Sequence, residues 1–438
     1  MLYRKIEKTI EDHFKTNSEK ILLIDGARQV GKTFIIRYIG KKLFKNFIEI
    51  NLVEDSIGQK LFKDTNTVED FYLKLSITAG NKMGSKEDTL VFLDEIQTYP
   101  NFLTLLKFLK DDGRFTYIAS GFLLGVTLMQ TTSIPMGSIK KVEMYPLDFE
   151  EFLYANGISE TFIAFLKDNF EARKTLDDAL HSKMMDLFKK YLISGGLPDA
   201  VNEFLETQNV QKVREIQTEI HSYYATDASK YDTEKKLKIR KIYDLIPSNM
   251  EKTKKRIVAK DIEGKKGKDF LDYQEEFDYL ISAGIALNVQ AISNPVFPLI
   301  QSAKKNLLKL YLNDVGILSA LLYGNNIQAI TEDIRSINLG ALYEAVVACE
   351  LISHGHTLYY YDNRNKGEVD FLLDDYSNLS VLPLEVKSGR NYTIHSALSS
   401  FVSNPDYSVK QALVLSNCRE FKVKGKILYA PIYNVMFL

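Results

Sequence analysis

A glycine-rich loop near the amino terminus limits the folds open to this chain. Residues 26–33 read GARQVGKT and fit the phosphate-loop pattern GxxxxGK(S/T). The apolar run KILLID ends at Asp25 directly before the loop, and the periodic segment FIIRYI follows it. The glycine backbone and the positive end of a helix together hold phosphate groups. We therefore expect a strand, the loop and a helix here, with a chance glycine-rich turn as the alternative.

Apolar runs alternate with helical patterns through the first third of the sequence. The runs are typical of buried strands and cover residues 20–25, 46–52, 89–94 and 115–119. The helical patterns follow Gly31 and cover the segments around 68–79 and 101–111. This alternation predicts an α/β domain with a mainly parallel sheet, covered on both faces by helices. We place it at residues 1–150.

The phosphate-loop pattern predicts chemical roles for the residues of the loop. The predicted nucleotide-binding positions within it are Gly26, Ala27, Arg28, Gln29, Val30, Gly31, Lys32 and Thr33. Lys32 is expected to reach the β- and γ-phosphates of ATP. The Thr33 hydroxyl is expected to be a ligand of Mg²⁺.

A second apolar strand ends in the acids Asp94 and Glu95. Asp94 is expected to hold Mg²⁺ through water, and Glu95 to orient or deprotonate the attacking water. The alternative is that both acids cap the helix that follows. Ser120 lies at the tip of the next strand, where a polar side chain can contact the γ-phosphate; a plain turn residue is the alternative there.

The middle of the chain is predicted to hold two further regions. Residues 151–235 show helical patterns, with a break at Gly195–Pro198 that we interpret as a structural hinge. Residues 236–310 show helices followed by strand-like runs at 285–292 and 306–312, which favours a winged-helix-like module. Its basic clusters between residues 235 and 268 are candidates for DNA contact, and a solvated lysine face is the alternative.

The C-terminal part, residues 325–438, is predicted to be a compact α/β domain with a hairpin that brings two carboxylates together. A turn symmetric about Ser377 and Asn378 would place Asp370 opposite Glu385. The same register brings apolar residues together on the other face: Val369, Phe371, Leu373, Leu382, Leu384 and Val386.

Like charges that face each other need neutralisation. A divalent metal is one solution, and Lys387, one step along on the same face, is another. The alternative to a metal site is a purely structural hairpin whose acids are matched by Lys387 and Arg390.

Several sequence blocks carry a family resemblance. They occur in the order GARQVGKT, VFLDEIQ, YPLDFEEFL, ISGGLPDAV, YLNDVGIL, GALYE, GEVDF and LEVKSG. Together they resemble AAA-type ATPases of bacteria and archaea that carry a C-terminal domain of unknown function related to restriction endonucleases. The resemblance covers nearly the whole chain.

The resemblance implies roles for the C-terminal residues as well. The arrangement Asp-x14-Glu-x-Lys is similar to the core of the PD-(D/E)XK nucleases, with Glu344 as the usual extra carboxylate. It implies that Asp370, Glu385 and Glu344 hold Mg²⁺ or Mn²⁺, and that Lys387 positions the attacking water. Asp370, Glu385 and Lys387 are then catalytic residues.

One position departs from the family pattern. Members usually carry an arginine shortly before the YPLDF-like block, whereas this chain has Gly137-Ser138, followed by Lys140 and Lys141. If that arginine contacts the γ-phosphate in family members, this chain either uses a lysine for the same contact or lacks the contact. The arginines considered as substitutes are Arg28, Arg37 and Arg114.

The net charge, the cysteine count and the length of the apolar runs argue against several classes of protein. The formal net charge of −1 argues against a wholly basic nucleic-acid coat, and two cysteines are too few for a disulfide framework. No apolar run approaches the roughly 18 residues that span a bilayer. We expect a cytoplasmic ATPase, without a membrane partner, whose nucleotide state controls a DNA-directed, nuclease-like domain. The alternative is an ATP-dependent switch or scaffold that binds protein or nucleic acid without cleaving it.

Overall fold

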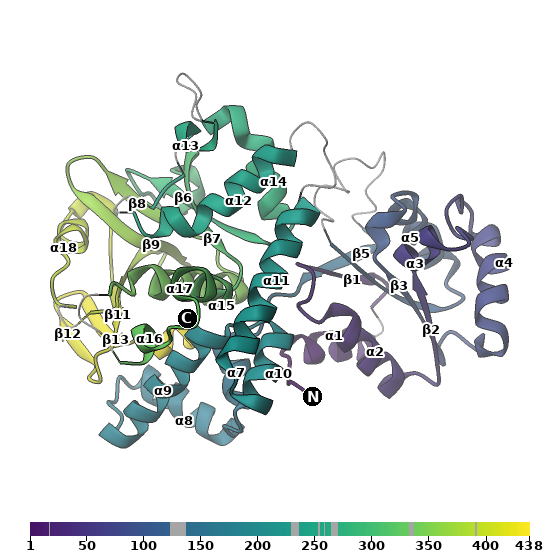
Figure 1. Cartoon of the computed structure of the whole chain (residues 1–438), viewed down its shortest axis with the longest axis horizontal. Coiled ribbons are helices and arrows are strands. Elements are labelled where there is room, and N and C mark those ends of the chain that lie inside the picture. Colours follow the sequence, from purple (N-terminus) through teal and green to yellow (C-terminus); the bar gives the residue numbers. More distant parts are fainter. Residues whose placement is uncertain are drawn as a thin grey trace. The chain divides into compact units, whose positions relative to one another are not determined.

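The computed structural model describes residues 1–16, 18–122, 137–228, 236–252, 255–257, 259–263, 270–332, 337–389 and 392–438. The chain divides into two compact units, residues 3–145 with 282–284 and residues 146–281 with 285–438. Figure 1 traces the elements of each unit in chain order. No described helix is long and apolar enough to cross a membrane.

A parallel sheet forms the centre of the first unit. Its strands are β1 (Ile21–Asp25), β2 (Asn46–Asn51), β3 (Thr89–Asp94), β4 (Thr116–Gly121) and β5 (Ile139–Glu143). They lie in the order β2-β3-β4-β1-β5, and every pairing is parallel. The strands expected at the four apolar runs are therefore confirmed. Because the strands are parallel, their carboxyl ends share one edge of the sheet, and the phosphate loop follows β1 at that edge.

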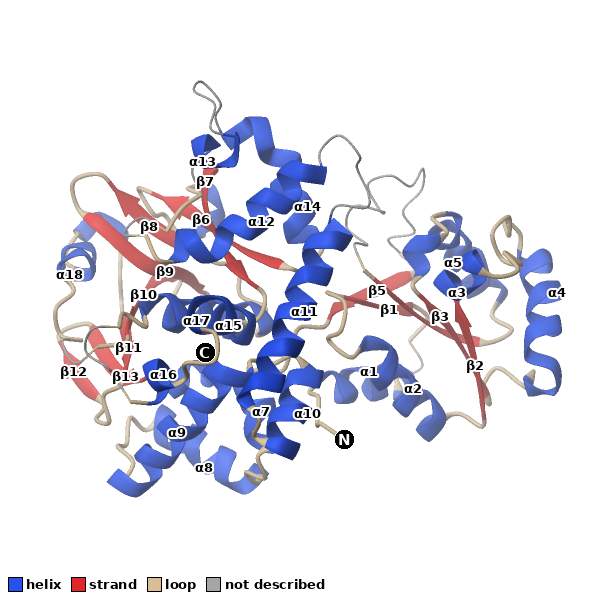
Figure 2. Ribbon diagram, in the orientation of Figure 1, coloured by secondary structure: helices blue, strands red, loops and turns tan. Residues whose placement is uncertain are grey.

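Helices cover both faces of this sheet (Figure 2). They are α1 (Ile6–Lys15), α2 (Lys32–Leu43), α3 (Leu52–Ile57), α4 (Val68–Ala79), α5 (Asn101–Asp112) and the short 3₁₀ turns η1 (Gly80–Lys82) and η2 (Ile96–Thr98). Alternate residues of the strands point to opposite faces, so Leu23 and Val91 pack with Phe71 and Phe102 of α4 and α5. On the other face, Gly40 of α2 lies against Phe47 and Leu90.

The second unit begins with a run of helices. Its helices are α7 (Phe149–Ala155), α8 (Glu160–Glu171), α9 (Asp178–Ser194), α10 (Pro198–Thr207), α11 (Val210–Ala228), α12 (Lys236–Met250), α13 (Ala259–Glu263), α14 (Gln274–Ser282), α15 (Val315–Tyr323), α16 (Gln328–Thr331), α17 (Gly340–Ser353) and α18 (Ser396–Val402). Its 3₁₀ turns are η3 (Phe270–Tyr273), η4 (Leu299–Gln301), η5 (Pro405–Tyr407) and η6 (Ile432–Phe437). Gly195, with φ of 65°, ends α9, and Pro198 opens α10. Both roles agree with the helix break expected from the sequence.

A mixed sheet completes the second unit. Its strands are β6 (Ala286–Ile292), β7 (Lys304–Leu312), β8 (Tyr359–Asn363), β9 (Gly367–Asp375), β10 (Ser380–Lys387), β11 (Ala412–Ser416), β12 (Lys422–Lys424) and β13 (Ile427–Pro431). They lie in the order β12-β13-β11-β10-β9-β8-β6-β7. The hairpin β6–β7, which the sequence assigned to a separate winged-helix-like module, thus belongs to the same sheet as the C-terminal strands. The reason is that β8 pairs with the edge of β6, which would otherwise expose its backbone N–H and C=O groups.

Candidate functional sites

The phosphate loop has the backbone that its glycines make possible. Gly26 has φ of 147° and Gly31 has φ of 98°, both in the region that favours glycine. A Cβ on Gly26 would also collide with the carbonyl oxygen of Met144. Gly31 is followed directly by α2, so the loop ends at a helix amino terminus. This is the geometry that holds a phosphate group.

Lys32, at the end of the phosphate loop, forms hydrogen bonds with the first two residues of the loop. Its Nζ donates to the carbonyl oxygens of Gly26 at 2.8 Å and Ala27 at 2.7 Å. The side chain is buried, and burial lowers the pKa of Lys32 to about 8, against the opposing effect of nearby acids such as Glu95. A buried ammonium group that binds only carbonyl oxygens is stabilised when an anion comes close to it.

Asp94 is the acid on which the other predicted metal-site residues converge. The Thr33 hydroxyl donates to its Oδ2 at 3.0 Å, and the Ser120 hydroxyl donates to its Oδ1. Asp94 is 2 % exposed. Burial raises the pKa of Asp94 and Glu95 adds to the rise, although the hydrogen bonds from Ser120 and Thr33 lower it in part. A hydroxyl and a buried carboxylate at one edge of the sheet are oxygen donors that suit Mg²⁺.

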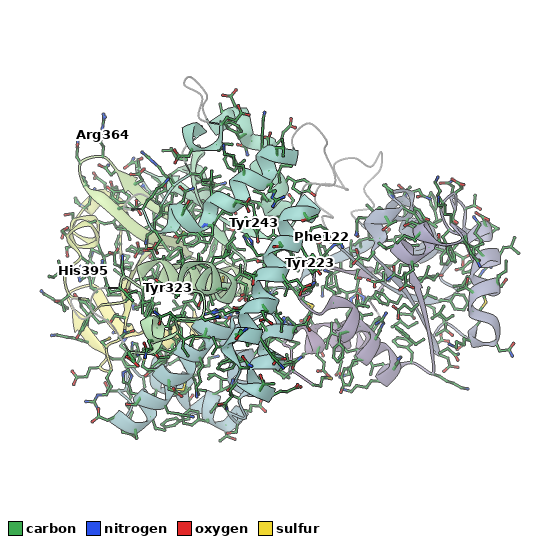
Figure 3. The ribbon with its side chains drawn as sticks, in the orientation of Figure 1. Phe122, Tyr223, Tyr243, Tyr323, Arg364 and His395 are labelled. Atoms are coloured by element: carbon green, nitrogen blue, oxygen red, sulfur yellow. The ribbon has the colours of Figure 1, made fainter. Side chains whose placement is uncertain are left out.

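Glu95 is held by a residue that the sequence analysis did not single out. Its backbone is left-handed, with φ of 57°, and its carboxylate accepts a hydrogen bond from Gln97 Nε2 at 2.5 Å. The side-chain oxygen of Gln97 in turn accepts from the backbone N–H of Phe122 at 3.1 Å. Phe122, labelled in Figure 3, directly follows β4. Gln97 therefore links Glu95 to the end of the strand that carries Ser120.

Arg4 is a second contributor that the motifs do not reveal. Its guanidinium donates to the carbonyl oxygen of Val30 in the loop at 2.7 Å and to that of Tyr145 at 2.6 Å. Arg4 is buried, and it lies before α1, far from the loop in sequence. No spacing pattern signals such a contact, since it depends on the tertiary packing of α1 against α2.

The position that lacks the family's arginine lies away from the loop. Ile21 pairs with Ile139, whereas Asp25 pairs with Glu143. Ser138 therefore lies at the amino edge of the sheet, roughly 15 Å of strand away from the loop. Lys141, one of the two lysines considered as replacements, binds Asp25 Oδ2 at 2.7 Å.

Two of the three arginines considered as substitutes are engaged elsewhere. Arg37 forms an ion pair with Glu49 at 2.5 Å. Arg114 lies 3.3 Å from Asp112. Arg28 lies within the loop itself, with its guanidinium 5.4 Å from the centre of the Phe122 ring.

In the second unit, β9 and β10 form the hairpin with the register expected from the sequence. Leu382 pairs with Leu373, and Leu384 pairs with Phe371. The ladder ends at this pair, and the same register continued by one residue would put Glu385 opposite Asp370. Of the six apolar residues expected to share the other face, Leu382 is half-buried and the rest are buried.

Each carboxylate of the predicted metal site is engaged by another group of the chain. Asp370 Oδ2 accepts from the backbone N–H of Val386 at 2.8 Å. Glu385 Oε1 lies 2.7 Å from Lys387 Nζ. Glu344, on α17, forms an ion pair with Lys255 and accepts from the Tyr311 hydroxyl at 3.3 Å.

The carboxylates are close enough to perturb one another. Burial raises the pKa of Asp370 well above its usual range, and the charges of Glu344 and Glu385 add to this effect. Burial also raises the pKa of Glu385, against the opposing effect of Lys387. Among the described residues, however, no group of three His, Cys, Asp or Glu side chains is arranged to hold a metal ion. The expected set of three ligands is therefore not formed among these residues.

Lys309 is the residue of this cluster that the sequence analysis missed. It lies on β7, is 0 % exposed, and forms an ion pair with Glu368. Burial alone would lower the pKa of Lys309, but Glu368 and the other nearby acids raise it. Its Nζ also lies 4.5 Å from the centre of the Tyr360 ring. The lysine comes from a strand that the sequence placed in another module.

Several basic side chains of the segment expected to contact DNA form ion pairs with acids of the chain. Lys255 binds Glu344, Arg256 lies 3.2 Å from Asp362, and Lys252 lies 2.8 Å from Asp261. Other members of the predicted basic clusters lie outside the described residues, namely Lys235, Lys254, Lys265, Lys266 and Lys268, as does Arg390 of the structural alternative.

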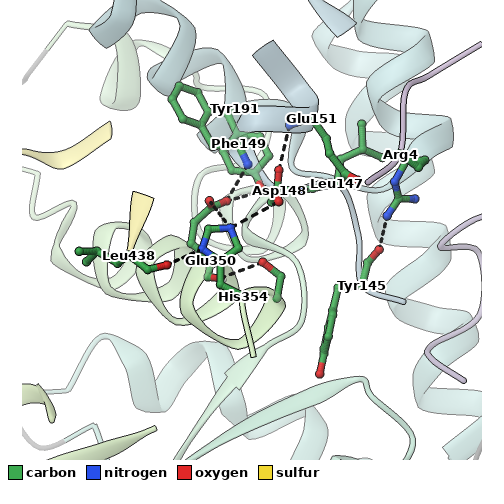
Figure 4. Close-up of polar contacts among 11 residues, drawn as sticks. Arg4, Tyr145, Leu147, Asp148, Phe149, Glu151, Tyr191, Glu350, His354 and Leu438 are labelled. Atoms are coloured by element: carbon green, nitrogen blue, oxygen red, sulfur yellow. Dashed lines mark hydrogen bonds and ion pairs between the residues drawn. The ribbon is translucent and has the colours of Figure 1, made fainter. Parts of the chain in front are cut away.

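Helix α17, which carries Glu344, is anchored at its carboxyl end (Figure 4). Glu350 accepts from the backbone N–H of Phe149 at 2.7 Å. His354 Nε2 lies 3.4 Å from Asp148, and its Nδ1 lies 3.0 Å from the carbonyl oxygen of Leu438. The YPLDF block is thus tied to α17, which fixes the helix that presents Glu344.

The match of the sequence to a known family agrees with the fold of the first unit. Residues 18–153 match a family model described as an AAA domain. The N-terminal part thus has the sequence pattern of an AAA domain. Residues 185–328 and 339–435 match models described as domains of unknown function, DUF8612 and DUF4143. These matches give no support to the nuclease-like resemblance of the C-terminal part.

Solved structures resemble the chain at low identity. A Walker-type ATPase of Pyrococcus abyssi is 13 % identical over 73 % of this chain and 96 % of its own, with a TM-score of 0.43. The Orc1 protein of Aeropyrum pernix in complex with DNA is 14 % identical over 74 % and 93 %, with a TM-score of 0.33. AMPPCP-bound DnaA from Aquifex aeolicus is 13 % identical over 63 % and 86 %, with a TM-score of 0.29. No curated protein matches the sequence.

Proposed function

We propose that the AAA domain binds Mg-ATP through residues 26–33 and hydrolyses it. The observation that carries the proposal is the convergence of Thr33 and Ser120 on the buried carboxylate of Asp94, at the edge where the loop begins α2. Mg²⁺ supplies a Lewis acid for the phosphate oxygens when it is bound. Thr33 and Asp94 are the residues that would hold it.

The remaining roles follow from the contacts of the side chains. Lys32 exchanges its two carbonyl acceptors for phosphate oxygens, which are stronger partners for an ammonium group. Glu95, oriented by Gln97, takes the proton of the attacking water. Arg28 is the arginine of the loop that can balance the charge of the leaving phosphate. Release of phosphate from ATP, with and without Mg²⁺, tests the proposal when wild type is compared with Glu95→Gln.

We also propose that the C-terminal carboxylates form a divalent-metal site that acts on DNA. Support comes from the burial of Asp370 and Glu385, from the charge of Glu344, which adds to the rise in the pKa of both, and from Lys387 beside them. Asp370 and Glu385 would hold the metal, which would supply a Lewis acid for the hydrolysis of a phosphodiester, and Lys387 would position the water.

The ion pairs of this cluster favour the alternative, a switch or scaffold that binds without cleavage. Lysines already neutralise Glu344 and Glu385, as a structural cluster would require. Purified protein incubated with DNA and with RNA, with and without ATP, in Mg²⁺ and in Mn²⁺ separates the two functions. Shortened products that Asp370→Asn abolishes support the metal-dependent nuclease. Retarded but intact nucleic acid supports the binding function.

A further inference from the structure

We infer that Lys255 is an internal counter-ion that keeps Glu344 out of the C-terminal metal site until it is displaced. The inference rests on the proposed metal site and adds its regulation. Lys255 and Glu344 are far apart in sequence, and their side chains are 16 % and 8 % exposed in the ion pair that they form. The second oxygen of Glu344 accepts from Tyr311. Both oxygens of this carboxylate are therefore occupied by groups of the chain.

One acid of the cluster, Glu385, has a carboxylate oxygen that no described group satisfies. Glu385 is 6 % exposed, and its Oε2 is a buried oxygen without a hydrogen-bond partner among the described residues. A buried carboxylate oxygen without a partner is costly unless a ligand satisfies it. Carboxylate oxygens are the donors that Mg²⁺ and Mn²⁺ prefer. Asp370, opposite Glu385, is the second donor on the hairpin.

The three lysines around these acids differ in how firmly they are held. Lys309 is fully buried on β7, and Lys387 lies on β10 two residues from its partner Glu385. Lys255 itself lies in neither a helix nor a strand. It is therefore the lysine that can leave with the smallest change in the fold. Its departure frees Glu344 as the third carboxylate.

Ligation of the metal by Glu344 and the Lys255–Glu344 ion pair are thus alternative states of that carboxylate, whereas Asp370 and Glu385 are the donors in both. Glu344 adds to the apparent metal affinity only in the fraction of molecules in which it is released from Lys255, and in wild type that fraction is small. Removing the ammonium group removes this competition. The expected result is tighter metal binding through Glu344 itself, beyond the general attraction that any lost positive charge adds.

The test is a calorimetric titration of the full chain with Mn²⁺ in the absence of nucleotide. Lys255→Gln should bind Mn²⁺ about tenfold more tightly than wild type or more. Lys252→Gln is the matched control, because its partner Asp261 lies outside the cluster, and it should bind as wild type does. Lys255→Arg, which keeps the charge, should also bind as wild type does.

Glu344→Gln separates ligation from electrostatics. In the wild-type background it should change Mn²⁺ affinity little, whereas in Lys255→Gln it should abolish the gain. A gain that persists without Glu344, or no gain in Lys255→Gln, overturns the inference. Asp370→Asn tests the underlying site: if it binds Mn²⁺ as wild type does, the proposed metal site itself is wrong. If it loses binding while Lys255→Gln changes nothing, only the counter-ion role fails.

Discussion

Gln97 donates a hydrogen bond from its Nε2 to Oε2 of Glu95 at 2.5 Å. Gln97 is buried, and its own oxygen is fixed by the backbone N–H of Phe122. The carboxylate proposed to activate water is therefore oriented by the strand that carries Ser120. A shift at the end of β4 would reach Glu95 through this one side chain.

Replacing Gln97 by Ala should lower kcat for ATP hydrolysis and leave the affinity for ATP nearly unchanged. The lost hydrogen bond to a charged group corresponds to about 1.5 kcal/mol, or roughly tenfold in rate. Steady-state hydrolysis over a range of ATP concentrations gives kcat and KM separately. A rise in KM at constant kcat would show that Gln97 serves nucleotide binding instead.

Replacing Lys32 by Ala should weaken ATP binding strongly. A charge-assisted contact to phosphate contributes about 3 kcal/mol, or roughly a hundredfold in Kd. Calorimetric titration with ATP and Mg²⁺ measures the change. Glu95→Gln is the matched control, because it should retain wild-type affinity and lose hydrolysis. Unchanged affinity in Lys32→Ala would refute the assignment of the loop.

Replacing Lys309 by Met should destabilise the second unit by about 3–5 kcal/mol, because it leaves buried acids without their cation. Chemical unfolding followed by the signal of the second unit reports the change. Lys190→Met is a suitable comparison, since Lys190 forms an exposed pair with Asp186 and should lose less than about 1 kcal/mol. Equal losses in the two variants would mean that Lys309 does not neutralise the cluster.

Local patterns predicted the elements of both candidate sites but not the long-range contacts that complete them. The register that pairs Leu384 with Phe371 follows from the two-residue period of a short hairpin, so the sequence is sufficient for it. Lys309 was missed because β7 reaches β9 only through β6 and β8, and no local spacing encodes that order. Lys255 looked like part of a DNA-binding surface, since charge runs carry no information about which acids they meet.

Asp314 gives the chain a pH-dependent stability that can be measured. Its carboxylate accepts from the backbone N–H of Gly196 at 2.7 Å and of Ile317 at 2.9 Å, so it ties the Gly195–Pro198 break to the start of α15. Burial nevertheless raises the pKa of Asp314 from 3.8 to about 6. Because the folded state holds this proton more tightly than the unfolded state, the free energy of unfolding falls as pH rises from 3.8 to about 6. The full loss corresponds to roughly 3 kcal/mol.

Asp314→Asn does not titrate, and its amide oxygen can still accept one of the two hydrogen bonds. The stability of wild type relative to this variant should therefore be greater near pH 4 than near pH 7, by roughly 2 kcal/mol, because part of the full loss has already occurred at pH 4. Urea unfolding of both proteins at the two pH values gives the difference, which cancels the titration of all other groups. Asp186→Asn, at an exposed position, provides the reference. The difference between its free energy of unfolding and that of wild type should change far less between the two pH values. The prediction fails if the free energy of unfolding of wild type relative to Asp314→Asn stays constant or increases toward pH 7. In that case the hydrogen bonds from Gly196 and Ile317 outweigh the cost of burying the charge.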